Sequence, residues 1–187
     1  MVKVMHKILG GMVLMMLLPF VCRAEETNID ALQYVGGTIP IIRRVEVSGP
    51  GYADFFSTVM ADDYAAGFKA SENGATTLTI TANKAWKVLV RTMPFTKIEE
   101  YVKPASDLHL RIKDKTVVHE GEGNGGTLSE TFTDFAPLSE QDQVLWANTT
   151  GGDNGCTAKI DFKVLLNAAM DISGTYTTTV TYTICAP

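Results

Sequence analysis

The sequence contains few of the residues that enzymes most often use for catalysis or metal binding. Its 187 residues include three cysteines, three histidines and two tryptophans. It has no G-x-S-x-G nucleophile elbow, and no cysteine–histidine spacing suits zinc. His109 shares parity with Arg111 and Lys113, which predicts a solvent-facing side chain. We therefore expect a non-enzyme, with no catalytic residues, no metal ligands and no cofactor.

An acidic pair and two glycine-rich segments could nevertheless form a site. Asp62 and Asp63 are adjacent, so in a strand they would point to opposite faces, and in a turn they would be solvated. The segments GEGNGG (Gly121–Gly126) and GGDNG (Gly151–Gly155) have the glycine and oxygen content of calcium loops. Both lack the spaced acidic ligands and distal glutamate of an EF-hand. Hairpin turns are therefore favoured, with calcium binding as the alternative.

The N-terminus has the layout of a secretory signal peptide. Lys3 and Lys7 precede the apolar run Ile8–Val21, and Ala24 offers a cleavage position. The run is shorter than the roughly 20 residues that a membrane-spanning helix needs. A membrane anchor and a lipoprotein modified at Cys22 are the alternatives, the second disfavoured by the large residues before the cysteine. We expect a secreted, periplasmic or cell-surface protein that meets the membrane only through its signal peptide during export.

Removal of this segment would make the chain strongly acidic. Three of the 16 basic residues would leave with it, so 13 would remain against 21 acidic residues, a net charge of about −8. Such a charge does not suit a nucleic-acid partner, because the phosphates would be repelled. The roughly 163 residues that remain are enough for one domain with its own core.

Two cysteines, Cys156 and Cys185, would remain after cleavage. In an oxidising compartment two thiols most simply form one disulfide, and we predict this bridge. It would close a loop of roughly 30 residues and stabilise the fold by about 3 kcal/mol. Two unrelated buried thiols are the alternative. The parity is awkward for a bridge, because Cys185 falls on the threonine face of its segment.

Much of the chain alternates apolar and polar residues. The last segment, GTYTTTVTYTIC, places Tyr176, Val180 and Tyr182 on one face and threonines on the other. Period-two alternation is typical of half-buried antiparallel strands, and threonine favours extended backbone on the solvent face. Strands are predicted at residues 41–49, 75–83, 85–92, 108–114, 142–148, 158–166 and 175–184.

Turn sequences separate these segments, and helical periodicity is almost absent. The turns are SGPG, SENG, GEGNGG and TTGGDNG, and only Thr96–Lys103 has a pattern that could form one or two helical turns. Short strands at this spacing predict an all-β sandwich or barrel. The predicted organisation is a signal peptide over residues 1–24, an N-terminal extension over 25–38 and a β-sandwich domain over 39–187.

Two stretches of the chain resemble a broad group of exported bacterial proteins. TLTITANKAWKVLVRT carries Trp86 after a short turn, and GTYTTTVTYTI carries the run Gly174, Tyr176, Val180 and Tyr182. This layout resembles the immunoglobulin-like β-sandwich proteins of the spore coat protein U and pilin-like type. The resemblance implies an antiparallel immunoglobulin-like sandwich, secretion, and a place in surface or fibre structures, which pilin-like members build by donating a strand to a neighbour. The CAP tail departs from the pilin pattern.

These inferences favour a non-enzymatic structural or adhesive protein of the bacterial envelope, such as a fibre or surface-layer subunit. Its expected partners are copies of itself or other envelope proteins. The segment Glu25–Gly37 could add a strand to a neighbouring subunit. Its alternation is poor, because Gln33 follows Ile29 and Ala31 on the same face. A complete, self-sufficient sandwich is therefore favoured over strand exchange.

A glycan- or ligand-binding module is the alternative function. It would need exposed aromatic rings, and Trp86 and Trp146 are the candidates for ligand contact. Both share parity with an apolar neighbour, Val88 and Val144 respectively, which predicts that they face inward. A secreted hydrolase that acts through His109 or His119 is a third class, without a local motif to support it.

Overall fold

The computed structural model describes residues 38–49, 59–71, 74–116 and 124–187. The chain divides into two compact units, Met1–Ile39 and Pro40–Pro187. All helices and strands described below belong to the second unit. The predicted signal peptide and nearly all of the predicted extension lie outside the described residues.

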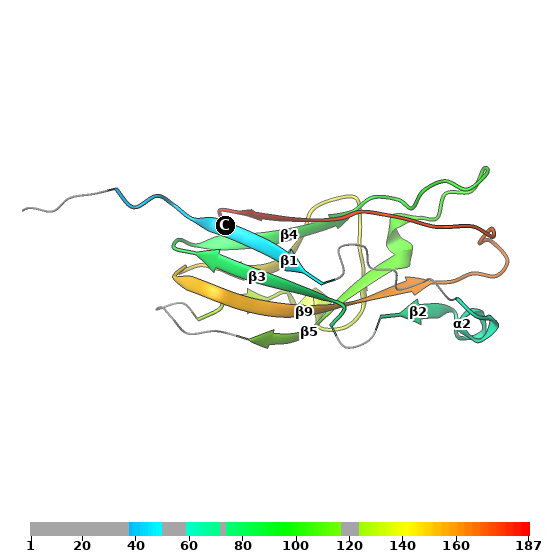
Figure 1. The fold of residues 1–187 in the computed structure, drawn as a ribbon, viewed down its shortest axis with the longest axis horizontal. Coiled ribbons are helices and arrows are strands. Elements are labelled where there is room, and N and C mark those ends of the chain that lie inside the picture. The colour runs from blue at the N-terminus through cyan, green and yellow to red at the C-terminus, as the bar shows by residue number, and fades with distance from the viewer. Residues whose placement is uncertain (1–37, 50–58, 72–73, 117–123) are drawn as a thin grey trace, which may run out of the picture. The chain divides into compact units, whose positions relative to one another are not determined.

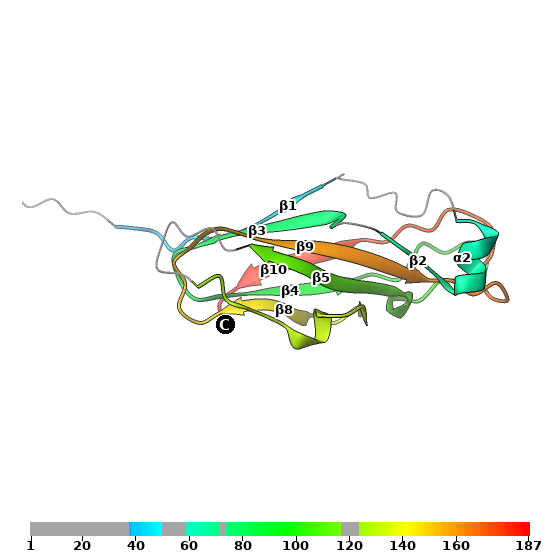
Figure 2. The ribbon, with the colours of Figure 1, turned by 90° about the horizontal axis from the view of Figure 1, so that it is seen from below.

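The second unit is an antiparallel β-sandwich. Its strands are β1 (Arg43–Ser48), β2 (Phe68–Ala70), β3 (Thr76–Ala82), β4 (Trp86–Thr92), β5 (Leu108–Thr116), β6 (Thr127–Leu128), β7 (Ala136–Pro137), β8 (Gln143–Asn148), β9 (Asp153–Leu165) and β10 (Val180–Cys185). One sheet has the order β1–β3–β9–β5–β7, with β2 paired to the end of β9, and the other has the order β10–β4–β8–β6. In Figure 2, β3 and β9 lie in one layer and β4 and β8 in the other. The predicted all-β sandwich is confirmed.

The predicted alternation of side chains produces the core. In β3 and β4 every second residue is buried, and Leu78, Ile80, Val88 and Val90 have no exposed surface. Side chains from both sheets form one hydrophobic cluster. Burying a side chain of this size stabilises the fold by about 1.5–3 kcal/mol. The core therefore follows from the two-residue period, which places all the apolar residues of a strand on one face.

All seven predicted strands occur, and the largest shifts are at the starts of two, β9 and β10. β9 begins at Asp153 rather than at 158, so residues 153–155 (DNG) are already part of a strand and the turn is confined to the residues before them. β10 begins at Val180, but the backbone before it continues alongside the chain that follows β4. The amide of Met93 donates to the carbonyl of Thr179 at 3.2 Å, and that of Thr96 to Thr177 at 2.8 Å.

The helical expectation for residues 96–103 is wrong. Ile98 and Tyr101 form an isolated antiparallel bridge, and Glu99 in the turn between them has φ 51°. A left-handed residue stops a helix from continuing. The short 3-10 turns η1 (Ala105–Asp107) and η2 (Glu130–Phe132) lie elsewhere.

A short helix, α2 (Ala61–Ala66), contains the acidic pair that the sequence singled out. The side chain of Asp63 accepts a hydrogen bond of 2.8 Å from the amide of Met60 at the start of the helix, and pairs with Lys69 at 3.0 Å. A carboxylate here satisfies an amide that has no partner within the helix. Asp63 thus stabilises the start of a helix, and its carboxylate is already engaged by the Met60 amide and the Lys69 ammonium. None of the helices in the described ranges is long and apolar enough to cross a bilayer.

Candidate functional site

Trp86 and Trp146 are fully buried in the sandwich core. Their rings meet edge to face, with centroids 5.2 Å apart and an interplanar angle of 81°. The inward orientation predicted from their parity is confirmed. Neither ring is exposed for a ligand to stack on, so the glycan-binding alternative loses the two contacts on which it depended.

A buried carboxylate ties the two tryptophans to the turn between β8 and β9. Asp153 is 3% exposed and accepts hydrogen bonds from Trp86 Nε1 at 2.7 Å, from the Asn148 amide group, and from the Gly125 backbone at 2.9 Å. Trp146 Nε1 donates to the carbonyl of Gly125 at 2.7 Å. The carboxylate of GGDNG is therefore occupied by protein donors. Within the described residues no group of three or more histidine, cysteine, aspartate or glutamate side chains is placed to hold a metal ion.

The predicted disulfide between Cys156 and Cys185 is not formed. Cys156 lies in β9, on the inner face, opposite Ile80. Cys185 ends β10 in the other sheet, opposite Lys87. The parity mismatch seen in the sequence is the physical reason, because Cys185 belongs to the outward-facing threonine side of its strand and Cys156 to the core.

His109 lies on the outer face of the larger sheet, opposite Lys163 of β9, and is half buried. Its outward orientation agrees with the prediction from parity, and His119 lies outside the described residues. Burial lowers the pKa of His109 below 6.5, and the charge of Lys163 adds to this, while Asp107 and two backbone carbonyls oppose it. His109 therefore favours its neutral form in the folded state.

This shift predicts a pH dependence of stability. Because the folded-state pKa is depressed, the unfolded chain takes up a proton first as the pH falls below 6.5. The stability due to neutral His109 is present above that pH and is lost as the pH falls towards the folded-state value. We expect the free energy of unfolding of the wild type to drop relative to a His109→Asn variant between neutral and mildly acidic pH, measured by urea denaturation. A pH-independent difference between the two would contradict it.

On one side of the sandwich, both sheets end in an edge strand that has no outer neighbour among the described residues. β1 ends the larger sheet and β10 ends the smaller one, and the two strands lie close together (Figure 1, cyan and red). In the immunoglobulin arrangement, strands A, B and E share one sheet, and strand F lies between C and G in the other. β1, β3 and β9 occupy the places of A, B and E, and β4 and β10 those of C and F. No described strand occupies the place of G beside β10.

The inward side chains of β1 are left uncovered on this side. Val45 and Val47 pair in register with Ile80 and Leu78, so they face the same way as these two fully buried residues. Val47 is nevertheless 57% exposed, and Val45 is only partly buried. A further strand in the opposite sheet would cover both valines.

β10 is incompletely buried in the same way. Val180, Tyr182 and Ile184 pair with fully buried residues of β4, yet are themselves only partly buried. We call the five side chains Val45, Val47, Val180, Tyr182 and Ile184 the open side. Covering apolar surface of this kind gains about 25 cal/mol for each Å² removed from water.

The edge of β10 also presents backbone hydrogen-bonding groups. The carbonyl of Thr179 accepts from the amide of Met93, so it points towards β4 and the chain that follows it. Successive residues of a strand point their backbone groups in alternate directions, so those of Val180, Tyr182 and Ile184 point away from β4. No strand in the described residues pairs with them. An unpaired edge of this kind is a template for another strand.

The hydroxyl of Tyr182 is the polar exception on the open side. Its oxygen is buried and has no hydrogen-bond partner among the described residues. Burial raises the pKa of this hydroxyl, so it stays a neutral donor and acceptor. A buried hydroxyl without a partner costs about 1–3 kcal/mol.

Sequence reasoning missed the open side. The alternation placed Val45 and Val47 inward, but which strands lie at the edges depends on how the strands pair. The one available signal is the apolar content of β1 and of the residues just before it, where Ile41 and Ile42 are also exposed, at 64% and 44%. Exposed large apolar residues in a cluster commonly mark an interaction surface.

The chain matches no model of a known protein family and no curated protein. The resemblance to spore coat protein U and pilin-like proteins therefore stays a prediction. What supports a function is the geometry of the open side.

Proposed function

We propose that this protein is a non-enzymatic structural subunit of a secreted or cell-envelope assembly, and that subunits join by adding a strand at the outer edge of β10. The observation that carries the proposal is the open side, where inward residues of both sheets lack a cover and the backbone of β10 lacks a partner. Strand addition satisfies both needs at once, because it supplies backbone hydrogen bonds and alternate side chains. A complete sandwich, which the sequence analysis favoured, would have neither uncovered inward residues nor an unpaired backbone at β10.

The proposed occupant is the segment Glu25–Thr38 of a second copy. Its 14 residues could extend to about 45 Å, which exceeds the roughly 20 Å of a six-residue strand such as β10. Arg43 at the start of β1 donates to the carbonyl of Ala85, and Cys185 at the end of β10 pairs with Lys87. The chain thus enters β1 at the end of the sandwich where β10 finishes. To run along its own β10, the segment would have to reverse direction at this end of the sandwich. The same segment of another subunit can lie along β10 without such a reversal.

The irregular alternation of the segment matches the chemistry of the open side. Ile29, Ala31, Gln33 and Val35 share one parity, and Gln33 is the polar exception among them. Tyr182 is the polar exception on the receiving side. Three of these four residues are apolar, as are four of the five side chains of the open side, so the two surfaces are complementary in apolar character.

The test uses the exported protein, recovered from an oxidising compartment, in size exclusion coupled to light scattering. We expect oligomers whose mass grows with concentration and falls when a synthetic peptide of residues 25–40 is added in excess. The peptide should also raise the melting temperature, because it binds the folded state. A monomer at all concentrations that ignores the peptide would sink the proposal.

Matched substitutions on β1 locate the contact. Val47→Asp places a charge on the open side, whereas Ser48→Asp places one next to it on the exposed outer face. We expect Val47→Asp to abolish assembly and Ser48→Asp to leave it unchanged. Equal effects of the two aspartates would show that the contact lies elsewhere.

A further inference from the structure

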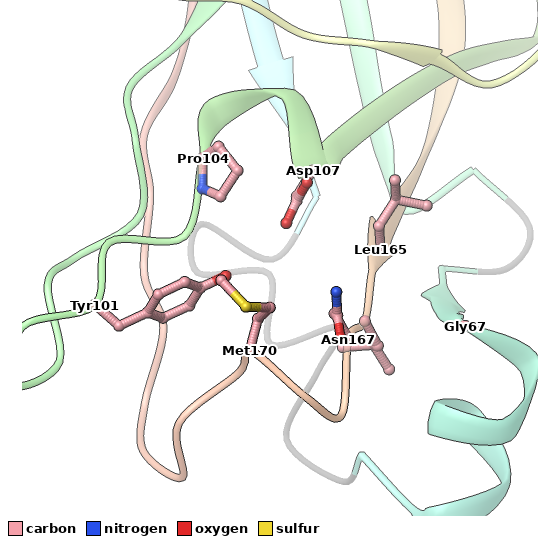
Figure 3. Close-up of a pocket in the computed structure, with 8 residues that line it drawn as sticks. Gly67, Tyr101, Pro104, Asp107, Leu165, Asn167 and Met170 are labelled. Carbon is pink, nitrogen blue, oxygen red and sulfur yellow. The ribbon is translucent and has the colours of Figure 1, made fainter.

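A second recess lies at the end of the sandwich where β9 finishes. It is a cavity of about 430 Å³ between the end of β9, the residues after α2 and the start of η1. Figure 3 shows Tyr101 on one wall, Asp107 above, Leu165 and Asn167 opposite, and Met170 below. Its volume falls within the roughly 300–1,000 Å³ of small-molecule sites. None of its lining residues belongs to the open side.

A buried charge cluster lies behind this cavity. Lys103 is 2% exposed, and its ammonium contacts Asp171 at 2.8 Å and Asp107 at 3.1 Å. Asp171 is satisfied internally, because it also accepts from the hydroxyl of Tyr101 and from the amide of Asn167. Two carboxylates against one ammonium leave a surplus of one negative charge. That surplus falls on Asp107, whose side chain is 22% exposed and lines the cavity.

The polar groups that face the cavity form a donor–acceptor pair. In Figure 3 the carboxylate of Asp107 and the amide nitrogen of Asn167 point into the same space. The side-chain oxygen of Asn167 already accepts from the amide of Ala169 at 3.0 Å, which fixes its NH₂ group as the free end. A ligand would therefore meet a negative acceptor and a neutral donor side by side.

The remaining walls suit a partly apolar cation. The ring of Tyr101 is held edge to face against Tyr176, with centroids 6.3 Å apart, so its orientation is fixed. An aromatic face attracts cations and packs against the C–H faces of sugar rings. The thioether of Met170 and the side chain of Leu165 supply apolar contact.

We propose that this cavity binds a protonated amino sugar. The ammonium group donates to Asp107, a neighbouring hydroxyl accepts from Asn167, and the ring packs on Tyr101. A neutral or anionic sugar would not offset the surplus negative charge of the cluster, so the site discriminates by the charge of the amine. The inference is independent of the proposed strand addition, which uses other residues.

The test is isothermal titration of the exported protein with glucosamine and with N-acetylglucosamine, at a mildly acidic pH where the free amine is charged. We expect glucosamine to bind with a Kd on the order of 1 mM, and the acetylated sugar at least tenfold more weakly. Asp107→Asn should remove the preference and weaken glucosamine binding by about tenfold. This variant leaves Lys103 paired with Asp171, so its charges stay balanced.

Two further variants keep the outcome decisive. Asp142→Asn alters an exposed carboxylate far along the chain and should not change binding. Met170→Arg places a cation at an exposed position of the cavity wall and should abolish glucosamine binding while the protein stays folded. Equal affinity for the two sugars, no effect of Asp107→Asn, or no heat from glucosamine at about ten times the expected Kd would each overturn the proposal.

Discussion

Replacing Asp153 with alanine is expected to lower the free energy of unfolding by about 3–5 kcal/mol, a large share of the stability of a single domain. The carboxylate accepts hydrogen bonds from Trp86, Asn148 and Gly125 in the interior. Without it, these donors lie buried without a partner, and each costs about 1–3 kcal/mol. Urea denaturation followed by tryptophan fluorescence measures the change, because Trp86 donates directly to this carboxylate.

Two controls separate the lost hydrogen bonds from a general effect of removing charge. Asp134→Ala removes an exposed carboxylate and should change stability by less than about 0.5 kcal/mol. Asp153→Asn keeps one acceptor oxygen and should fall between the wild type and the alanine variant. A loss below about 1 kcal/mol for Asp153→Ala would mean that water replaces the carboxylate at no cost.

The second large effect is expected at the buried pair Lys103 and Asp171. Both side chains are 2% exposed, and their charged atoms are 2.8 Å apart. Removing Lys103 leaves the Asp171 charge buried without a cation, so Lys103→Met should cost about 3–5 kcal/mol. Asp171→Leu should cost less, because Asp107 still pairs with Lys103. Chemical denaturation of the single variants measures this loss.

The double variant tests whether the cost comes from the unpaired charge. Replacing an ion pair by two apolar residues removes the buried charges, so Lys103→Met with Asp171→Leu should be less destabilised than the sum of the single changes, by about 1–3 kcal/mol. Strict additivity would show that the two residues do not act as a pair. Asp107 is more exposed than Asp171 and can be solvated in the double variant.

The strands could be predicted because their signal is local. β3 and β4 read as TTLTITA and WKVLVRT, and a two-residue period on a short segment fixes both the structure and the buried face. α2, β2, β6 and β7 have at most six residues each and little alternation, so nothing in their sequence distinguishes them from loops. Their structure is imposed by the longer strands that they contact, such as β9 for β2.

The candidate sites could not be predicted in the same way. The parity of Val47 shows that it faces inward. Only the strand order, which places β1 and β10 at the edges of their sheets, shows that nothing among the described residues covers it. The charge cluster joins Lys103 to Asp171, which are 68 residues apart. The cysteine prediction was wrong because it counted thiols and gave too little weight to parity, which places Cys156 on the core side of β9 and Cys185 on the outward-facing side of β10.

β9 sets the direction in which the domain resists mechanical force. It is 13 residues long, about 40 Å, with Asp153 and the tryptophans at its first residue and the Lys103 cluster just beyond its last. A force applied along the strands would load in shear the rows of hydrogen bonds that join β9 to β3 and β5. All the bonds of a row would then share the force at once. The buried charges at the two ends would keep those rows from opening one bond at a time. In a chain of subunits joined as proposed, the strand added beside β10 would be loaded in shear as well, because it too is held by a row of backbone hydrogen bonds.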